Sequence, residues 1–346
     1  MLYKGPYIAG SINRTTNSAG QINASGNANV QIGDNHNFHE DFLPGFPRAR
    51  SVAPSPSSIP SLSASGSNDF KFDVAIFCAL PLEADAVEAL FDERWDSDNQ
   101  YGKARGDPNA YSAGVIGTHN VVLVYMSGIG KSHGATAAAF CRCSFPSVRL
   151  ALVLGICGGA PSTPDDQEIC LGDVVISSGV VQYDFGRRYA HGLERKDTLL
   201  DTLGRPSLEI RLLLDELGRQ CGRERLQNKL LEHLHVALRK LGRVSGSDMH
   251  GGMGWQCGPT IAPTVHIGLV ASGDQVIKSE EFRNSLMAKE GVIAFEMEGA
   301  GIWDTFPCLV IKGVADYADR NKNREGQDYA AATSAACAKA FLELWV

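Results

Sequence analysis

Four carboxylates stand where apolar segments of the sequence end, and such positions suit acid–base chemistry. They are Glu83, Asp274, Glu298 and Asp316. Glu298 follows closely on the apolar residues 292–295, and a single alanine separates Asp316 from the apolar run before it. Each carboxylate alone is typical of a solvated loop or a helix start, where acidic residues are common. Together they predict a partly buried crevice, in which desolvation raises a carboxyl pKa and supplies an acid near neutral pH.

A glycine-rich turn is a second candidate for chemistry. Residues 128–134 contain three glycines, between an expected strand at 120–126 and an expected helix at 131–143. The N–H groups at the start of such a helix can bind a dinucleotide pyrophosphate. A dinucleotide-binding fold also places an acidic residue at the end of the next strand, where this chain has Leu-Gly-Ile at 154–156. The turn is equally well explained as a tight connection that lets helix and strand approach each other.

The elements that must position these residues alternate between strand and helix. Strands are predicted at 71–79, 111–116, 120–126, 150–154, 172–176, 265–271, 292–295 and 308–314. Helices are predicted at 81–91, 131–143, 280–289, 299–305 and 328–344, with a helical pair at 208–241 inside a helical insert of about 190–260. This alternation indicates an α/β sheet, whose ligands bind at the carboxyl ends of the strands.

The composition excludes several classes of protein. A net charge of −7 over 346 residues repels phosphate backbones, so we expect no nucleic-acid partner. The apolar run at 150–157 is far shorter than the ~20 residues that span a bilayer, so we expect no membrane segment. The polar start of the chain resembles no signal peptide, which favours a cytoplasmic protein. Nine cysteines without a Cys-x-x-Cys pair predict reduced thiols, and we expect neither metal nor cofactor.

Residues 1–69 differ from the rest of the chain, because Gly, Ser, Asn and Pro make up 32 of those 69 positions. Isoleucine also recurs every ten residues from Ile12 to Ile32. The segment is therefore either a disordered tail and linker or a weak repeat, in which residues 10–40 of several copies stack on one another. Residues 70–346 remain for one catalytic domain.

Four ordered segments carry a family resemblance. They are 127–131 (SGIGK), 268–274 (GLVASGD), 295–300 (FEMEGA) and 310–316 (VIKGVAD). They resemble the motifs of the purine nucleoside phosphorylase and uridine phosphorylase superfamily. Within it, the chain is most similar to the methylthioadenosine/S-adenosylhomocysteine nucleosidases and to fungal nucleoside-phosphorylase-like domains. The resemblance covers about 70–346 apart from the insert, and it implies a three-layer α/β/α fold with a central mixed sheet.

The resemblance also implies roles for single residues. Glu298 would accept hydrogen bonds from the ribose hydroxyls, with Met297 packed on the sugar. Asp316 would protonate or hydrogen-bond N7 of a purine, and Glu83 would activate a water molecule. Further substrate-binding positions implied by these motifs are Glu296, Ser127, Gly128, Ile156, Cys157, Gly158, Val276 and Ala315. Val276 replaces an aromatic residue of the nucleosidases and Ala315 replaces a serine, so the resemblance does not identify the purine.

The implied activity is that of a purine nucleoside N-ribohydrolase, which uses water to release free base and ribose. Val153 and Ile156 stand where the phosphorylases have an arginine and a serine for phosphate. The Glu83 carboxylate would moreover repel a phosphate dianion. Lys131 and Lys312 keep a phosphate-dependent purine nucleoside phosphorylase as an alternative, because lysine can bind phosphate as a point charge.

A third alternative is a non-catalytic nucleoside-binding module recruited by its N-terminal tail. As partners we expect a small-molecule purine nucleoside and further copies of the same chain, in a homo-oligomer of two or more subunits.

Overall fold

The computed structural model describes residues 71–95, 101–190, 192–242, 262–321 and 326–345. The predicted tail and its ten-residue repeat lie outside these ranges.

Strands and helices alternate along the chain, as predicted. The strands are β1 (Val74–Cys78), β2 (Glu93–Trp95), β3 (Ala110–Ile116), β4 (His119–Tyr125), β5 (Leu150–Gly159), β6 (Val174–Gln182), β7 (Gly186–Tyr189), β8 (Gly192–Arg195), β9 (Val265–Ser272), β10 (Val292–Glu296) and β11 (Cys308–Asp316). The helices are α1 (Pro81–Glu88), α2 (Lys131–Ser144), α3 (Leu208–Gly218), α4 (Gln220–Lys240), α5 (Glu280–Glu290), α6 (Gly299–Ile302) and α7 (Gln327–Leu342).

Nine of the strands form one mixed sheet in the order β10-β9-β6-β11-β5-β1-β4-β3-β2. Strand β5 pairs in parallel with β1 and β11, and its far end also pairs antiparallel with β10. That last pairing closes β10, β9, β6, β11 and β5 into a ring. The carboxyl ends of β5, β10 and β11 therefore meet at one place in the fold.

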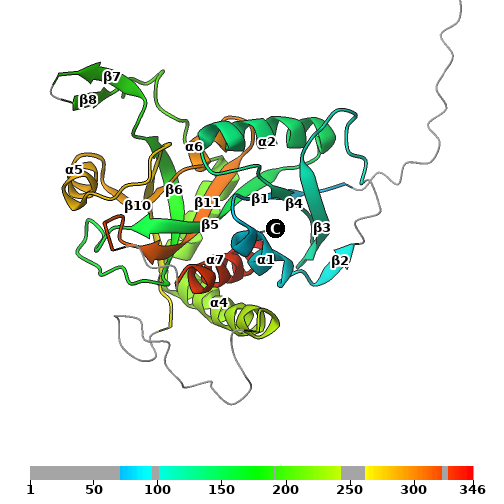
Figure 1. The fold of residues 1–346 in the computed structure, drawn as a ribbon. Helices are drawn as coiled ribbons and strands as arrows, with labels where there is room; N and C mark the ends of the chain where they lie inside the picture. Colours follow the sequence, from blue (N-terminus) through cyan, green and yellow to red (C-terminus); the bar gives the residue numbers. More distant parts are fainter. Residues whose placement is uncertain (1–70, 96–100, 191, 243–261, 322–325, 346) are drawn as a thin grey trace, which may run out of the picture. The chain divides into compact units, whose positions relative to one another are not determined.

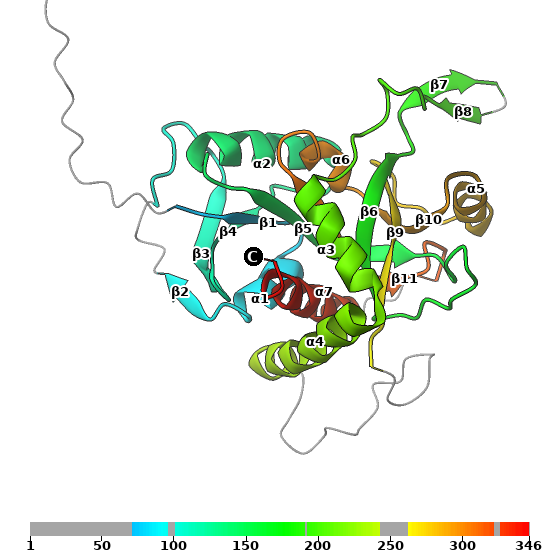
Figure 2. The same cartoon turned by 180° about the vertical axis from the view of Figure 1, so that it is seen from behind.

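Helices cover both faces of the sheet (Figure 1). Helices α2 and α6 lie on one face, α1 and α7 lie on the other, and α4 packs against α7, as the view from behind also shows (Figure 2). The residues of β1 alternate accordingly. Val74 and Ile76 join the apolar cluster that contains α1, α4 and α7, whereas Ala75 and Phe77 join the cluster under α2 and α6. Burial on both faces explains why this strand is continuously apolar.

The predicted three-layer fold with a central mixed sheet is confirmed, and the differences lie at element ends. We expected the strand at 150–154 to stop at its glycines, but β5 continues through Gly155, at φ +140°, to Gly159, because it pairs there with β10 and β11. The predicted helices at 81–91 and 299–305 are shorter than expected. Short strands β2, β7 and β8 were not predicted, and β8 lies in the range expected to be helical.

No helix in the described part of the chain is both long and apolar enough to cross a bilayer.

Candidate functional site

A pocket of about 250 Å³ lies at the carboxyl ends of the central strands. Strand β5 contributes residues 156–158, and the ends of β10 and β11 contribute carboxylates. The segments after β1, β4, β9, β10 and β11 and the start of α7 contribute the rest of the lining. The lining residues are Leu80, Glu83, Ile129, Ile156, Cys157, Gly158, Gln275, Val276, Ile277, Phe295, Glu296, Met297, Glu298, Asp316, Ala318 and Gln327. Most of these side chains are apolar and the charged ones are all acidic.

Glu83 is a buried carboxylate held by backbone N–H groups. Its Oε2 accepts hydrogen bonds from the N–H groups of Ala79 and Leu80, both at 2.9 Å, and its Oε1 accepts one from Ile156 at 2.9 Å. Burial raises the pKa of Glu83, although Lys312 and the N–H groups of Ile156 and Leu80 oppose the rise. A carboxylate fixed in this way can act as a base near neutral pH.

The position of Glu83 depends on a glycine in β5. A Cβ atom added to Gly155 would lie 1.9 Å from Oε1 of Glu83, and the backbone there has φ +140°. Only glycine leaves the space and adopts this conformation without strain. Glycine at this position therefore serves both the backbone conformation of β5 and the placement of the carboxylate.

Glu298, which lines the pocket, forms a buried ion pair with Lys312. Nζ of Lys312 lies 3.0 Å from Oε2 of Glu298 and 3.4 Å from the carbonyl oxygen of Leu154. Oε1 of Glu298 accepts a hydrogen bond from the N–H of Gly130 at 3.2 Å. Burial alone would lower the pKa of Lys312, but the carboxylates of Glu298, Glu83 and Glu296 outweigh it and raise that pKa. Lys312 therefore neutralises part of the acidic cluster.

Glu296 organises the turn that presents Glu298. Its Oε2 accepts from the N–H of Glu298 at 3.0 Å, and both of its oxygens accept from the N–H of Gly299. Burial, together with the neighbouring Glu298 charge, raises the pKa of Glu296. Although Glu296 lines the pocket, its oxygens are already committed to the backbone.

Asp316 occupies the end of β11 and also lines the pocket. Its Oδ1 accepts a hydrogen bond from the N–H of Ala318 at 2.8 Å. The residue is only partly buried, unlike Glu83, Glu296 and Glu298. Among the acids of the site, Asp316 is therefore the one best placed to meet a polar group of a ligand.

The glycine turn before α2 binds the protein's own carboxylates. The N–H of Gly130 donates to Glu298, and the N–H of Lys131 donates to Oδ1 of Asp274 at 2.8 Å. The Lys131 ammonium pairs with Asp184 and lies 3.6 Å from Oδ2 of Asp274. The N–H groups of Gly130 and Lys131 and the Lys131 ammonium, which could have held a pyrophosphate or phosphate, are thus occupied, and this favours the tight-turn explanation of the segment.

The structure brings most of the residues singled out in the sequence to this pocket. Those that line it are Glu83, Ile156, Cys157, Gly158, Val276, Glu296, Met297, Glu298 and Asp316. Ser127, Gly128, Ala315 and the strand-end carboxylate Asp274 are not among the lining residues. Ser127 lies within hydrogen-bonding distance of His133, with its Oγ 2.8 Å from Nδ1 of that ring, and Ala315 is buried in β11.

Several lining residues were not predicted as site residues. They are Leu80, Ile129, Gln275, Ile277, Phe295, Ala318 and Gln327. Most of them are direct neighbours of predicted residues, so proximity in sequence could have indicated them. Gln327 could not have been found in this way, because it begins α7 and stands 11 positions after Asp316.

Neither a metal site nor a cationic lining is present in the described part of the chain. No group of three or more His, Cys, Asp or Glu residues there could hold a metal ion. No lysine, arginine or histidine is among the described residues that line the pocket. The arrangement can bind hydroxyl groups, protonate a basic atom and deprotonate a water molecule.

Comparison with known proteins agrees with this geometry. A model of the phosphorylase superfamily matches residues 73–343. A 5′-methylthioadenosine/S-adenosylhomocysteine nucleosidase of Mycobacterium bovis is 26% identical over 277 residues, which cover 78% of this chain and 96% of the relative. A nucleotide-binding leucine-rich repeat (NLR)-like protein of Hyaloscypha variabilis is 32% identical over 300 residues. That match covers 79% of this chain but only 29% of the relative's length.

Solved structures share the fold. The Streptococcus pneumoniae methylthioadenosine/S-adenosylhomocysteine nucleosidase in complex with 8-aminoadenine has a TM-score of 0.53 at 23% identity, covering 78% of this chain and 99% of that one. The futalosine hydrolase of Helicobacter pylori has a TM-score of 0.54 at 20% identity, covering 79% and 98%.

Proposed function

The chain belongs to the phosphorylase superfamily, and we propose that it is a purine nucleoside N-ribohydrolase. It cleaves the N-glycosidic bond with water and releases the free purine base and ribose. The nucleosidase relative, which the chain matches over 96% of that relative's length, supports the reaction class. Methylthioadenosine and S-adenosylhomocysteine, named for that relative, are the first substrates to test alongside ordinary purine nucleosides.

The carboxylates divide the chemistry among them. Glu83 takes a proton from the attacking water, which adds to the anomeric carbon as the bond to the base breaks. Asp316 protonates N7 of the purine, so that the base leaves as a neutral group, or stabilises the negative charge of the departing base through a hydrogen bond to N7. Glu298 accepts hydrogen bonds from the ribose hydroxyls, while Met297 packs on the sugar. Glu296 holds the turn that carries Glu298.

The observation that carries hydrolysis rather than phosphorolysis is that the N–H groups of Gly130 and Lys131 and the two lysines near the pocket are already used. The N–H groups at the start of α2 donate to Glu298 and Asp274. Lys312 is buried against Glu298, and Lys131 pairs with Asp184. A phosphate dianion would also face a lining whose described charged residues are all acidic. Water, which is neutral, meets none of this repulsion.

The wider setting of the enzyme is part of the proposal. We place it in the cytoplasm as a homo-oligomer. Since the chain matches 29% of the length of an NLR-like protein, we also propose that such a domain works as an effector module recruited by its neighbouring segments. In this chain the recruiting segment would be residues 1–69.

The decisive experiment is a product assay on the full chain. Adenosine, inosine, guanosine, methylthioadenosine and uridine are each incubated with and without phosphate, and free base, ribose and ribose 1-phosphate are quantified. We expect purine release without phosphate, with the free sugar as the second product: ribose from the ordinary nucleosides and 5-methylthioribose from methylthioadenosine. Asp316→Asn and Glu83→Gln should each lower kcat by about 100-fold or more, because each removes a proton-transfer group.

A matched variant controls for loss of a surface charge. Asp304 is an exposed carboxylate outside the pocket, so Asp304→Asn should leave kcat unchanged. A strict requirement for phosphate would show that the enzyme is a phosphorylase and not a hydrolase. Binding of nucleoside without turnover in either buffer would identify a binding module instead.

A further inference from the structure

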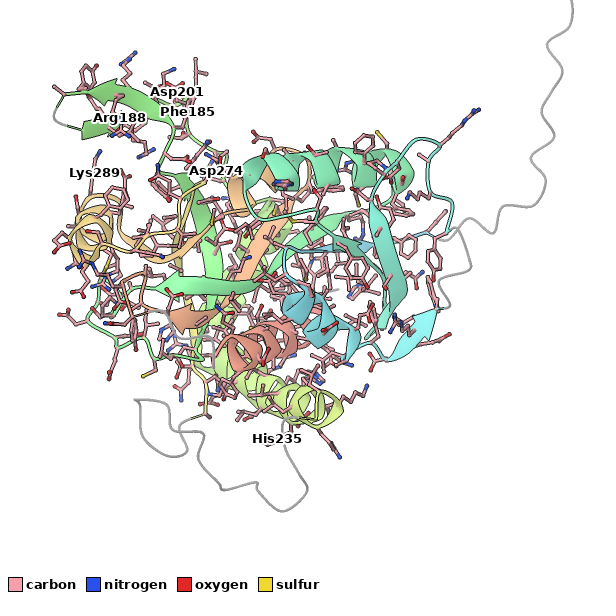
Figure 3. The ribbon with its side chains drawn as sticks, in the orientation of Figure 1. Phe185, Arg188, Asp201, His235, Asp274 and Lys289 are labelled. Atoms are coloured by element: carbon pink, nitrogen blue, oxygen red, sulfur yellow. The ribbon has the colours of Figure 1, made fainter. Side chains whose placement is uncertain are left out.

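Asp274 was singled out in the sequence with the other strand-end carboxylates, yet the proposed reaction gives it no part. It lies after β9, and Figure 3 shows it where the hairpin of β7 and β8 leaves the body of the domain. Its contacts join three segments that are distant in sequence: the turn before α2, the loop after β6 and its own loop.

These contacts form a closed triangle, which we call the loop clamp and define as Lys131, Asp184 and Asp274. Asp274 accepts from the N–H of Lys131 at 2.8 Å and lies 3.6 Å from its ammonium group. Asp184 pairs with the same ammonium through Oδ1 and accepts from the N–H of Asp274 through Oδ2 at 2.9 Å. All four carboxylate oxygens are therefore used, and each loop contacts both of the others.

The clamp is partly shielded from water. The side chains of Lys131 and Asp184 are only 16% and 14% exposed, whereas that of Asp274 is 51% exposed. Pairs with restricted access to solvent are screened less than surface pairs. The Lys131–Asp184 contact is thus able to restrain its loops, which a fully solvated ion pair seldom does.

Two clamp residues, Lys131 and Asp274, lie within two positions of residues that line the pocket. Ile129 precedes Gly130 and Lys131, while Gln275 and Val276 follow Asp274. Ile129 and Val276 are 47% and 50% exposed, so packing alone holds them loosely. The clamp therefore restrains the pocket rim at Ile129 and Val276, which packing against the protein interior restrains only weakly.

The clamp also reaches the ribose-binding carboxylate through one bond. Gly130, next to Lys131, donates its N–H to Oε1 of Glu298, and Lys312 holds the other oxygen. If the glycine turn moved away, Glu298 would lose one of its two fixed contacts. A hydrogen-bonding carboxylate displaced by a fraction of an ångström binds its substrate less well.

We propose that Lys131 is a positioning residue, which acts with Asp184 and Asp274 to hold the pocket rim and Glu298 in the geometry that binds the ribose. The kinetic part of this inference rests on the proposed function. Because Glu298 contacts the ribose before and during bond cleavage, loss of the clamp removes binding that substrate and transition state share. Such a loss raises KM and leaves kcat nearly unchanged.

The test compares Lys131→Met with Lys131→Arg and with a control lysine on the full chain. Lys131→Met should raise KM roughly 10-fold with kcat within about threefold. Lys131→Arg keeps the charge and should restore most of the affinity. Lys196 forms an ion pair with Asp201 at 3.4 Å outside the pocket, so Lys196→Met should leave KM unchanged. In Lys131→Met the further change Asp184→Asn should add little, because both residues belong to one unit.

Hydrogen exchange supplies a readout that needs no turnover. Peptides covering 127–134 and 273–277 should exchange faster in Lys131→Met than in the wild type or Lys196→Met. Equal exchange in all three would overturn the clamp, and so would a fall in kcat at unchanged KM. If the wild type releases no base from any nucleoside, the proposed function fails, and the exchange comparison still decides whether the clamp exists.

Discussion

Glu83 combines deep burial with three backbone hydrogen bonds, and this environment sets a pH dependence. Burial raises its pKa above the ordinary value of 4.5, while Lys312 and the N–H groups of Ile156 and Leu80 limit the rise. A general base must be ionised, so we expect kcat/KM to fall on the acid side as Glu83 takes up its proton. The midpoint of that fall should lie above pH 4.5. A pH–rate profile measures it, and an acid limb centred at or below that value would contradict the assignment.

The same shift predicts how stability depends on pH. The folded state binds the Glu83 proton more tightly than the unfolded chain does, because its pKa is raised on folding. The stabilisation is therefore fully present below the unfolded pKa and is lost as the pH rises through the folded one. Glu296, also raised by burial, contributes with the same sign. In urea unfolding, Glu83→Gln should show a shallower decline of unfolding free energy with pH than the wild type.

At the scale of elements, Gly155 of β5 leaves the space that the proposed base Glu83 occupies. An alanine there would place Cβ 1.9 Å from Oε1 of Glu83 and would force L-residue strain at φ +140°. We expect Gly155→Ala to cost about 1–3 kcal/mol of unfolding free energy, measured in urea. It should also lower kcat/KM by about 100-fold, because the base is displaced. Gly218→Ala is the matched control, since nothing lies within 4 Å of its added Cβ. Unimpaired turnover in Gly155→Ala would show that Glu83 need not occupy this position.

The sequence predicts the strands and helices better than the residues at which they end. It also predicts the pocket residues better than the contacts that hold them in place. Continuous apolar runs mark β1, β9, β10 and β11, and the carboxylates at or after the ends of β1, β10 and β11 mark the pocket, because strand ends converge in this kind of sheet. The course of β5 through its glycines depends on pairing with β10 and β11, which no local pattern reveals. The clamp was equally hidden, since Lys131 and Asp184 are 53 positions apart and meet only in the fold.

At the scale of the whole molecule, catalysis and recruitment are expected to reside in different parts of the chain. The described pocket residues all lie between Leu80 and Gln327, inside the stretch of 73–343 that matches the family. The composition of residues 1–69 suits a tail, a linker or a stacking repeat. We propose that this segment recruits the enzyme and contributes nothing to the reaction.

A truncation separates the two parts. Phe72 is fully buried, and its ring packs against Phe145 with centroids 4.9 Å apart, so packing of the domain has begun by that residue. We therefore expect residues 70–346 to retain the melting temperature and the kcat/KM of the full chain. A shorter chain of residues 80–346 lacks β1, which pairs with both β4 and β5, and should not fold. If residues 70–346 folded but lost activity, the segment 1–69 would have to contribute to the site. Sedimentation of both forms at high concentration tests the repeat, because stacking through residues 10–40 requires larger assemblies of the full chain alone.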